Sequence, residues 1–314
     1  MGKLAFIYPG QGSQAAGMGR SLADAFPSAR AVFDEVDAAL REKLSRLCFE
    51  GPEELLKLTA NTQPAILAVS AAATAVMAEE GVHPDLVAGH SLGEYSALVA
   101  AGAVSAADAA KAVRARGMFM QEAVPPGLGA MAAVLGLEPG RVTAICESVE
   151  AATGKVCSPA NYNEPAQTVI AGDASAVEKA SIELKAAGAR RVLPLPVSAP
   201  FHCALLEPVK DRLAPVLRAL RWREPRVAIV TNVEARPNRD VSRIVQLLLD
   251  QVTAPVRWLE CVEEMVRLGV DRMVELGPGR VLSGLVKRID GSVQVFNVED
   301  VESLEKTLVG LEEG

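Results

Sequence analysis

Aromatic side chains and long apolar runs are both scarce in this chain. Only 4% of the residues are aromatic although 50% are hydrophobic, so the core must consist mainly of Ala, Val and Leu, as in parallel sheets covered by helices. The longest apolar run, AILAVSAAATAVMA from Ala65, is too short to span a bilayer. It predicts a buried helix instead, and we expect no contact with a membrane.

Paired cysteines and an excess of positive charge are also missing. The five cysteines lie far apart and form no CxxC pair, which favours a reducing compartment over a disulfide framework. The start, MGKLAFIYPG, lacks the pattern of a signal peptide. A net charge of −7 argues against nonspecific binding of nucleic acid, which needs a basic face. We therefore expect a cytoplasmic protein that does not bind nucleic acid.

Apolar strand-like segments alternate with helical patterns along the chain, and this alternation predicts an α/β fold with a parallel sheet. LAFIYP and DLVAG predict the first strands, and VAIVTN, DRMVELG and VQVFNV predict later ones. PSARAVFDEVDAALREKL, TQPAILAVSAAATAVMAEE and SAADAAKAVRARGMFMQEAV predict helices between them.

A different order interrupts this pattern between Gly129 and Val197. There the segments read β-α-β-β-α-β, which is the ferredoxin-like unit. Proline-rich joints, PPG and LPLPVSAP, bound the stretch on both sides. We predict a ferredoxin-like subdomain of residues 128–197, inserted into an α/β domain made of residues 1–127 and 198–314.

A serine lies between two glycines in GHSLG, from Gly89 to Gly93. The segment fits G-x-S-x-G after a predicted strand and before a predicted helix, which is the context that makes the pattern credible. The glycines permit a tight, strained turn that exposes the Ser91 hydroxyl. The amide of Leu92 can then point at a developing oxyanion. Ser91 is therefore predicted to be a nucleophile.

A serine needs a base, and the chain contains three histidines. His90 adjoins Ser91 and would project differently from it, while His83 lies in a loop. By elimination the candidate is His202, in VSAPFHCALL. Asp173 is the only carboxylate near a strand end between serine and histidine, and it falls in the insertion. The sequence thus favours a dyad whose histidine is oriented by another group, such as a backbone carbonyl.

The loop GQGSQA, from Gly10 to Ala15, has two interpretations. It matches the G-x-G-x-x-G/A pattern of dinucleotide-binding proteins, and Asp34 and Glu35 follow at a suitable distance for a ribose contact. Against this, no clean helix starts where a pyrophosphate would bind. The other interpretation is that Gln11 supplies a second backbone amide to an oxyanion hole.

Seven segments together resemble one known family. They are GQGSQ at Gly10, GHSLGEYSALVAAG at Gly89, RGMFMQEAVPPGLGAMAAV at Arg116, NYNEPAQTVIAG at Asn161, LPVSAPFHC at Leu195, QVTAPVRW at Gln251 and ELGPGRVLSGL at Glu275. In this order they resemble the malonyl-CoA:acyl carrier protein transacylases of bacterial fatty acid synthesis. The resemblance implies a hydrolase-like α/β domain with a ferredoxin-like subdomain.

The resemblance also implies a reaction. The malonyl group of malonyl-CoA would pass to the phosphopantetheine thiol of acyl carrier protein through a malonyl-serine intermediate at Ser91, with neither metal nor redox cofactor. His202 would be the base, and Gln11 and Leu92 would supply the oxyanion-hole amides. The carbonyl of Gln251 would orient the histidine, and Arg116 would hold the free carboxylate of the substrate.

Other family segments imply supporting residues. His90 and Asn161 fall near the implied site, and Phe201 matches the Phe-His pair of malonyl-selective members. Because acyl carrier proteins are acidic, docking needs a local basic patch, for which we predict Arg190 and Arg191.

Three other functions are the alternatives to malonyl transfer: a serine hydrolase, a nucleotide-binding oxidoreductase and a catalytically silent carrier-binding module.

Overall fold

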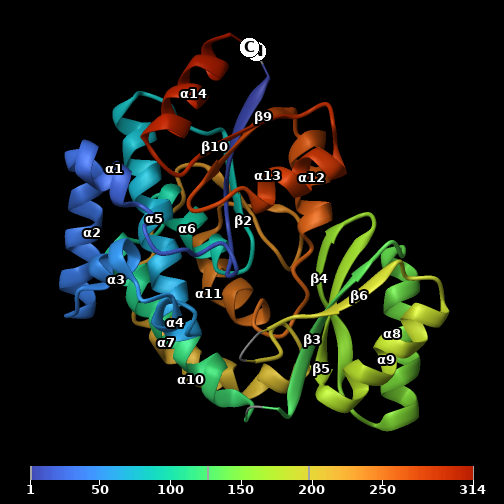
Figure 1. Cartoon of the computed structure of the whole chain (residues 1–314). Coiled ribbons are helices and arrows are strands. Elements are labelled where there is room, and N and C mark those ends of the chain that lie inside the picture. The colour runs from blue at the N-terminus through green and yellow to red at the C-terminus, as the bar shows by residue number, and fades with distance from the viewer. Residues whose placement is uncertain (1, 126, 197–198, 314) are drawn as a thin grey trace.

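The computed structural model describes residues 2–125, 127–196 and 199–313, which form a large α/β domain and a smaller unit beside it (Figure 1). The strands of the large domain are β1 (Lys3–Tyr8), β2 (Leu86–Gly89), β7 (Ala228–Val230), β8 (Pro237–Asn238), β9 (Val270–Leu276) and β10 (Gln294–Val298). Its helices are α1 (Arg20–Ala25), α2 (Pro27–Leu40), α3 (Leu44–Glu50), α4 (Glu53–Leu56), α5 (Thr59–Glu79), α6 (Gly93–Ala100), α7 (Ala106–Ala123), α10 (Glu207–Arg218), α11 (Val241–Asp250), α12 (Trp258–Arg267), α13 (Val281–Ile289) and α14 (Val301–Glu312), with a 3₁₀ turn at Ala204–Leu206.

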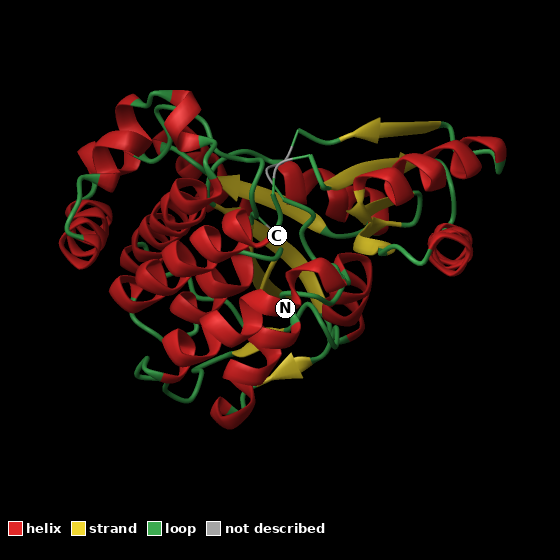
Figure 2. Ribbon diagram, turned by 90° about the horizontal axis from the view of Figure 1, so that it is seen from below, coloured by secondary structure: helices red, strands yellow, loops and turns green. Residues whose placement is uncertain are grey.

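The large sheet has the strand order β10-β9-β1-β2-β7-β8, and only the β7–β8 pair in it is antiparallel among the described strands. Alternate residues of β1 enter different cores, because side chains along a strand point to opposite faces. Phe6 and Tyr8 pack with α5 and its neighbours, whereas Ala5 and Ile7 pack with α12 and α13. Helices accordingly lie on both faces of this sheet (Figure 2).

The smaller unit consists of β3 (Gly129–Leu135), α8 (Pro139–Thr153), β4 (Cys157–Glu164), β5 (Gln167–Asp173), α9 (Ala174–Ala186) and β6 (Arg191–Pro194). Its sheet is antiparallel with the order β4-β5-β3-β6. Ala132 and Val134 of β3 pack under α8 and α9, while Met131 and Ala133 face Phe201 and Cys203 of the large domain.

These features confirm the predicted fold class, an α/β domain with a parallel sheet and a β-α-β-β-α-β unit. The predicted boundary between residues 197 and 198 lies outside the described residues, so the division of the chain at that point remains a prediction. The expected helix from Pro27 to Leu44 is shorter than predicted. It ends at Leu40 because Arg41 adopts a left-handed conformation, with φ of 56°.

The apolar run from Ala65 forms part of α5, a helix of 21 residues that is buried along most of its length. Small alanines allow α5 to pack closely against its neighbours, so the core needs few aromatic residues. Within the described part of the chain, no helix has both the length and the hydrophobicity needed to cross a membrane.

Candidate active site

Ser91 lies at the sharp turn between β2 and α6. Its φ is 53°, in the left-handed region that non-glycine residues adopt only at a cost. A Cβ atom on Gly89 would lie 1.9 Å from the carbonyl carbon of Gly93, and one on Gly93 would lie 2.1 Å from the carbonyl oxygen of Tyr8. Both flanking glycines are therefore required by the close approach of the backbone.

Asn232 braces this turn from the neighbouring strand. It follows β7, and its Oδ1 accepts a hydrogen bond from the Ser91 N–H at 2.7 Å. Its Nδ2 donates to the carbonyl oxygen of Gly89 at 2.7 Å. The two bonds offset part of the strain at Ser91 and hold the hydroxyl at the carboxyl edge of the sheet.

His202 lies within hydrogen-bonding distance of the serine, with Nε2 2.7 Å from Ser91 Oγ. Its Nδ1 donates to the carbonyl oxygen of Gln251 at 2.8 Å, and since a carbonyl only accepts, Nε2 carries the lone pair that faces the hydroxyl. Burial, with repulsion from Arg116, lowers the pKa of His202 to about 3. The imidazole is thus neutral at neutral pH, which is the form required of a general base.

The Arg116 guanidinium is the positive charge beside Ser91. It extends from α7 and is only 1% exposed. Nη2 donates to Ser91 Oγ at 3.0 Å and to Gln251 Oε1 at 2.9 Å, while Nη1 donates to Gln63 Oε1 at 2.9 Å. Its Nε–H has no hydrogen-bond partner among the described residues. A charged, fixed donor with an unused N–H suits a carboxylate.

Gln11 and Leu92, the two residues predicted to supply oxyanion-hole amides, lie in the same region. β1 and β2 pair so that Tyr8 lies opposite Gly89, which brings the loops after both strands to one edge of the sheet. Gln11 and Leu92 from these loops line a cavity together with Ser91. Among the described residues, neither the Gln11 N–H nor the Leu92 N–H donates to another backbone group. Both amides are therefore available to an oxyanion.

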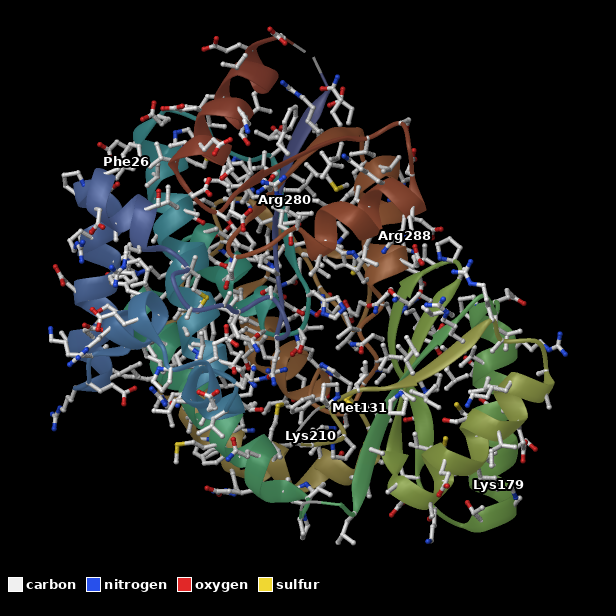
Figure 3. The ribbon with its side chains drawn as sticks, viewed as in Figure 1. Phe26, Met131, Lys179, Lys210, Arg280 and Arg288 are labelled. Atoms are coloured by element: carbon white, nitrogen blue, oxygen red, sulfur yellow. The ribbon has the colours of Figure 1, made fainter. Side chains whose placement is uncertain are left out.

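The serine faces a cavity of ≈ 120 Å³, which lies between the large domain and the smaller unit. A second cavity of ≈ 340 Å³ adjoins it, and the two share Gln11, His90, Asn161 and Leu195 as lining residues. Met131 of β3 lines the first and Arg288 of α13 lines the second (Figure 3). The reacting groups are thus reached through a path that both units form.

His90 lines both cavities, and its ring contacts Asn163, which lines the second one. Its Nε2 lies 2.9 Å from Asn163 Oδ1, and its ring centroid lies 5.9 Å from that of Trp258. Burial lowers the pKa of His90. These contacts fit a neutral, structural histidine that shapes the wall of the site.

Asn161 and Phe201 line the cavity beside the serine. Asn161 is buried in β4, and its backbone forms an isolated bridge with Val256 of the large domain. Phe201 immediately precedes His202, and its N–H lies 3.3 Å from the Met131 sulfur. Both residues therefore form part of the wall of the cavity that Ser91 faces.

Other predicted residues lie away from the serine. Arg190 and Arg191 are exposed. Arg191 begins β6, and three residues of this extended strand separate it from Leu195 at the cavity. Their docking role remains a prediction. Asp173 lies in the smaller unit, where its carboxylate accepts from the Val156 N–H at 2.8 Å. This position agrees with the expectation that Asp173 does not serve as the third member of a catalytic triad.

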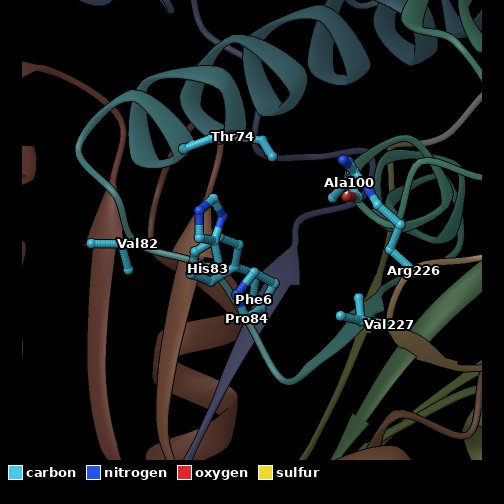
Figure 4. A pocket seen from close by; sticks show the side chains of 9 residues that line it. Phe6, Thr74, Val82, His83, Pro84, Ala100, Arg226 and Val227 are labelled. Carbon is cyan, nitrogen blue, oxygen red and sulfur yellow. Dashed lines mark hydrogen bonds between the residues drawn. The ribbon is translucent and has the colours of Figure 1, made fainter.

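His83 is exposed and lines a different cavity of ≈ 240 Å³, between the end of α5 and the strands β1 and β7 (Figure 4). Thr74 and Arg226 border the same cavity. It shares no lining residue with the cavity beside Ser91. His83 is therefore well suited as a control for His202, the candidate base.

The glycine-rich loop does not continue into a helix long enough to bind a pyrophosphate. α1 begins only at Arg20 and has 6 residues. Glu35, one of the two acids considered for a ribose contact, accepts from the Ala107 N–H at 3.0 Å. Gly10 lies against the serine turn instead, since a Cβ there would be 2.7 Å from the His90 carbonyl oxygen. The loop belongs to the serine site.

Sequence reasoning missed three side chains beneath the site, Gln63, Glu94 and Asn232. All three are buried and bonded to predicted site residues. Two signals could have indicated them: Asn232 is the last residue of the predicted strand VAIVTN in the parallel sheet, and Glu94 is the one charged residue of the predicted helix GEYSALVAAG. No local signal marks Gln63.

Comparisons with known proteins agree along the whole chain. Residues 5–308 match the family model described as an acyl transferase domain. The malonyl CoA-acyl carrier protein transacylase of Bacillus subtilis is 45% identical over 313 residues, covering 100% of this chain and 98% of that protein. An acyl carrier protein S-malonyltransferase structure from Vibrio cholerae has a TM-score of 0.94 and 46% identity, covering 97% of this chain and 99% of its own. A malonyl-transacylase solved in complex with its type II PKS acyl-carrier protein has a TM-score of 0.95 and 45% identity, covering 98% of this chain and 99% of that one.

Proposed function

This chain belongs to the malonyl CoA-acyl carrier protein transacylase family, and from that premise we propose which of its residues transfer the malonyl group from malonyl-CoA to acyl carrier protein. The single observation that carries the assignment is the position of Ser91 Oγ, between the neutral His202 Nε2 and the cationic Arg116 Nη2. That position joins a nucleophile, its base and a carboxylate-binding charge within one cavity.

In the first half-reaction, Ser91 Oγ attacks the thioester carbonyl of malonyl-CoA while its proton moves to His202 Nε2. The amides of Gln11 and Leu92 hold the oxyanion, each contributing roughly 3 kcal/mol as in comparable sites. The carbon–sulfur bond then breaks, and the leaving CoA sulfur takes the proton from His202. The product is a malonyl ester on Ser91, with free CoA.

In the second half-reaction, the phosphopantetheine thiol of the carrier gives its proton to His202 Nε2 and attacks the ester carbonyl. The same two amides stabilise the oxyanion. The carbon–oxygen bond breaks, and Ser91 Oγ recovers its proton from the histidine. The Gln251 carbonyl keeps the imidazole in one tautomer through both steps, so no carboxylate is needed as a third member.

The carrier and the cell compartment complete this proposal. A malonyl-transacylase with the same fold was solved bound to its acyl-carrier protein, which supports a carrier as partner here, with Arg190 and Arg191 as the proposed docking charges. A cytoplasmic location is supported by the five cysteines, all free and buried, because a reducing compartment keeps thiols unpaired.

Incubation of the enzyme with malonyl-CoA alone tests the proposal. We expect a stoichiometric burst of CoA and a persistent malonyl adduct on the intact protein by mass spectrometry, since transfer requires an incoming thiol. Addition of phosphopantetheinylated carrier should discharge the adduct. Continuous release of CoA without carrier would instead identify a serine hydrolase.

Replacement of Arg116 by Ala is expected to change substrate selectivity. The malonyl carboxylate would lose its buried charge partner, so kcat/KM for malonyl transfer should fall about 100- to 1000-fold, whereas acetyl transfer should fall less than about 10-fold. Steady-state kinetics with malonyl-CoA and acetyl-CoA measure both. Arg114→Ala is the matched control, because Arg114 lies on the same helix but pairs with Asn61 and Glu42 outside the cavity. Equal losses with both donors would show that Arg116 is only structural.

A further inference from the structure

Glu94 is a buried carboxylate directly beneath the nucleophile, and neither half-reaction uses it. It lies in the first turn of α6 and is only 2% exposed. Its Oε2 accepts hydrogen bonds from Gln251 Nε2 at 2.8 Å and from the Asn232 N–H at 3.1 Å. A buried carboxylate is costly unless it is fully bonded, so its presence here calls for a physical explanation.

Both partners of Glu94 contact the reacting groups. Gln251 accepts from Arg116 Nη2 through Oε1 at 2.9 Å and from His202 Nδ1 through its backbone oxygen at 2.8 Å. Asn232 accepts from the Ser91 N–H at 2.7 Å. A single intervening residue therefore connects the Glu94 carboxylate to each of these groups. Gln251 connects it to His202 and to the guanidinium, and Asn232 connects it to Ser91.

The carboxylate also determines which way the Gln251 amide faces. An ionised carboxylate only accepts, so it selects the orientation in which Gln251 Nε2 points toward Glu94 and Oε1 points toward Arg116. The opposite orientation would set the amide N–H₂ against the donors of the guanidinium. The Ser91 carbonyl oxygen, which accepts from the same Nε2 at 3.0 Å, favours the same orientation.

We propose that Glu94 is a positioning residue that fixes the Gln251 amide and thereby holds Arg116 in place for donors carrying a free carboxylate. This proposal rests on the function assigned above. It adds a selectivity determinant that does not line the substrate cavity. Glu94 sets selectivity through Gln251 and, by its charge, through the buried guanidinium, while its bond to the Asn232 N–H supports the turn at Ser91 for every donor.

The charges around Glu94 are few. Among the residues that the structure describes, Arg116 of α7, Cys261 of α12 and Tyr95 of its own helix are the titratable groups that interact with it. Burial raises the pKa of the Cys261 thiol and raises that of Tyr95 to about 12, so both are neutral and Arg116 is the one charged neighbour among them. Burial also raises the pKa of Glu94 to about 7, although its hydrogen bonds and Arg116 oppose this. Glu94 is therefore mainly an ionised carboxylate above about pH 7 and mainly a neutral acid below it.

Glu94→Gln tests the proposal in the first half-reaction. We expect kcat/KM for malonyl-CoA to fall about 10- to 100-fold, as for loss of a charged hydrogen bond, with less than about 3-fold change for acetyl-CoA. In an Arg116→Ala background the same substitution should change malonyl transfer by less than about 3-fold, because the two residues act in series. Equal losses for both donors, or losses that add in the double variant, would overturn the proposal.

Two further measurements separate positioning from folding. Glu275→Gln is the matched control, since Glu275 is also buried and bonded to backbone N–H groups but lies outside the cavity; it should leave the donor ratio unchanged. In the wild type, the rate of malonylation should decrease as the pH falls below about 7, because Glu94 becomes protonated. His202 cannot cause this decrease, because its pKa is about 3. A flat wild-type profile in that range contradicts the proposal even if Glu94→Gln fails to fold. A wild type that forms no adduct at all would instead refute the proposed function.

Discussion

Ser91→Ala is expected to abolish malonylation of the protein and to lower carrier malonylation by about 10⁶-fold, the size of loss seen when the serine nucleophile of a catalytic triad is removed. No other hydroxyl is held between a neutral imidazole and a guanidinium in the described residues. Intact-protein mass spectrometry after exposure to malonyl-CoA measures the adduct, and a carrier assay measures turnover.

The chain offers a matched control for this experiment. Ser96 lies on α6, is also buried, and has an Oγ without a hydrogen-bond partner in the described part of the structure. Ser96→Ala should therefore keep full adduct formation. Normal turnover by the Ser91→Ala variant would require a direct transfer without an ester and would refute the proposed mechanism.

His202→Ala is expected to slow both half-reactions by roughly 10⁴-fold, at the upper end of the range for loss of a general base. The serine would lose its proton acceptor, and the leaving sulfur would lose its proton donor, so neither ester formation nor ester discharge should stay fast. Rapid-quench measurement of CoA release and of adduct discharge reports the two steps separately.

His83→Ala is the control for this variant, since His83 is exposed and borders the separate cavity of Figure 4. It should retain normal rates for both half-reactions. If the His202→Ala variant kept its native melting temperature and lost less than about 10-fold in rate, another group would have to be the base.

Much of this fold could be predicted because its signals are local. Strand segments read from apolar runs, such as LAFIYP and VQVFNV, occur as β1 and β10. The β-α-β-β-α-β order of the smaller unit is visible because each of its elements is short and bounded by turn residues. The short helices α3 and α4 escaped prediction, since a few residues carry too little periodicity to reveal a helix.

The residues of the candidate site also differ in whether a local signal in the sequence marks them. Ser91 was predictable because glycines reveal the turn around it, and His202 because the chain has only two other histidines. The left-handed φ of 58° at His202 was not predictable, since no glycine marks it. The contacts of Gln63, Glu94 and Asn232 form only after α5, α6 and β7 have packed together, and no spacing in the sequence encodes those distances.

The reacting groups come from widely separated segments, with Gln11 near the start of the chain and Gln251 far toward its end. During synthesis on the ribosome, the serine therefore emerges long before the groups that activate it. A nascent or prematurely terminated chain lacking Gln251 would present an ordinary, unreactive alcohol, because its histidine would have no fixed tautomer. A chain that ends before Gln251 is therefore expected to form no malonyl ester.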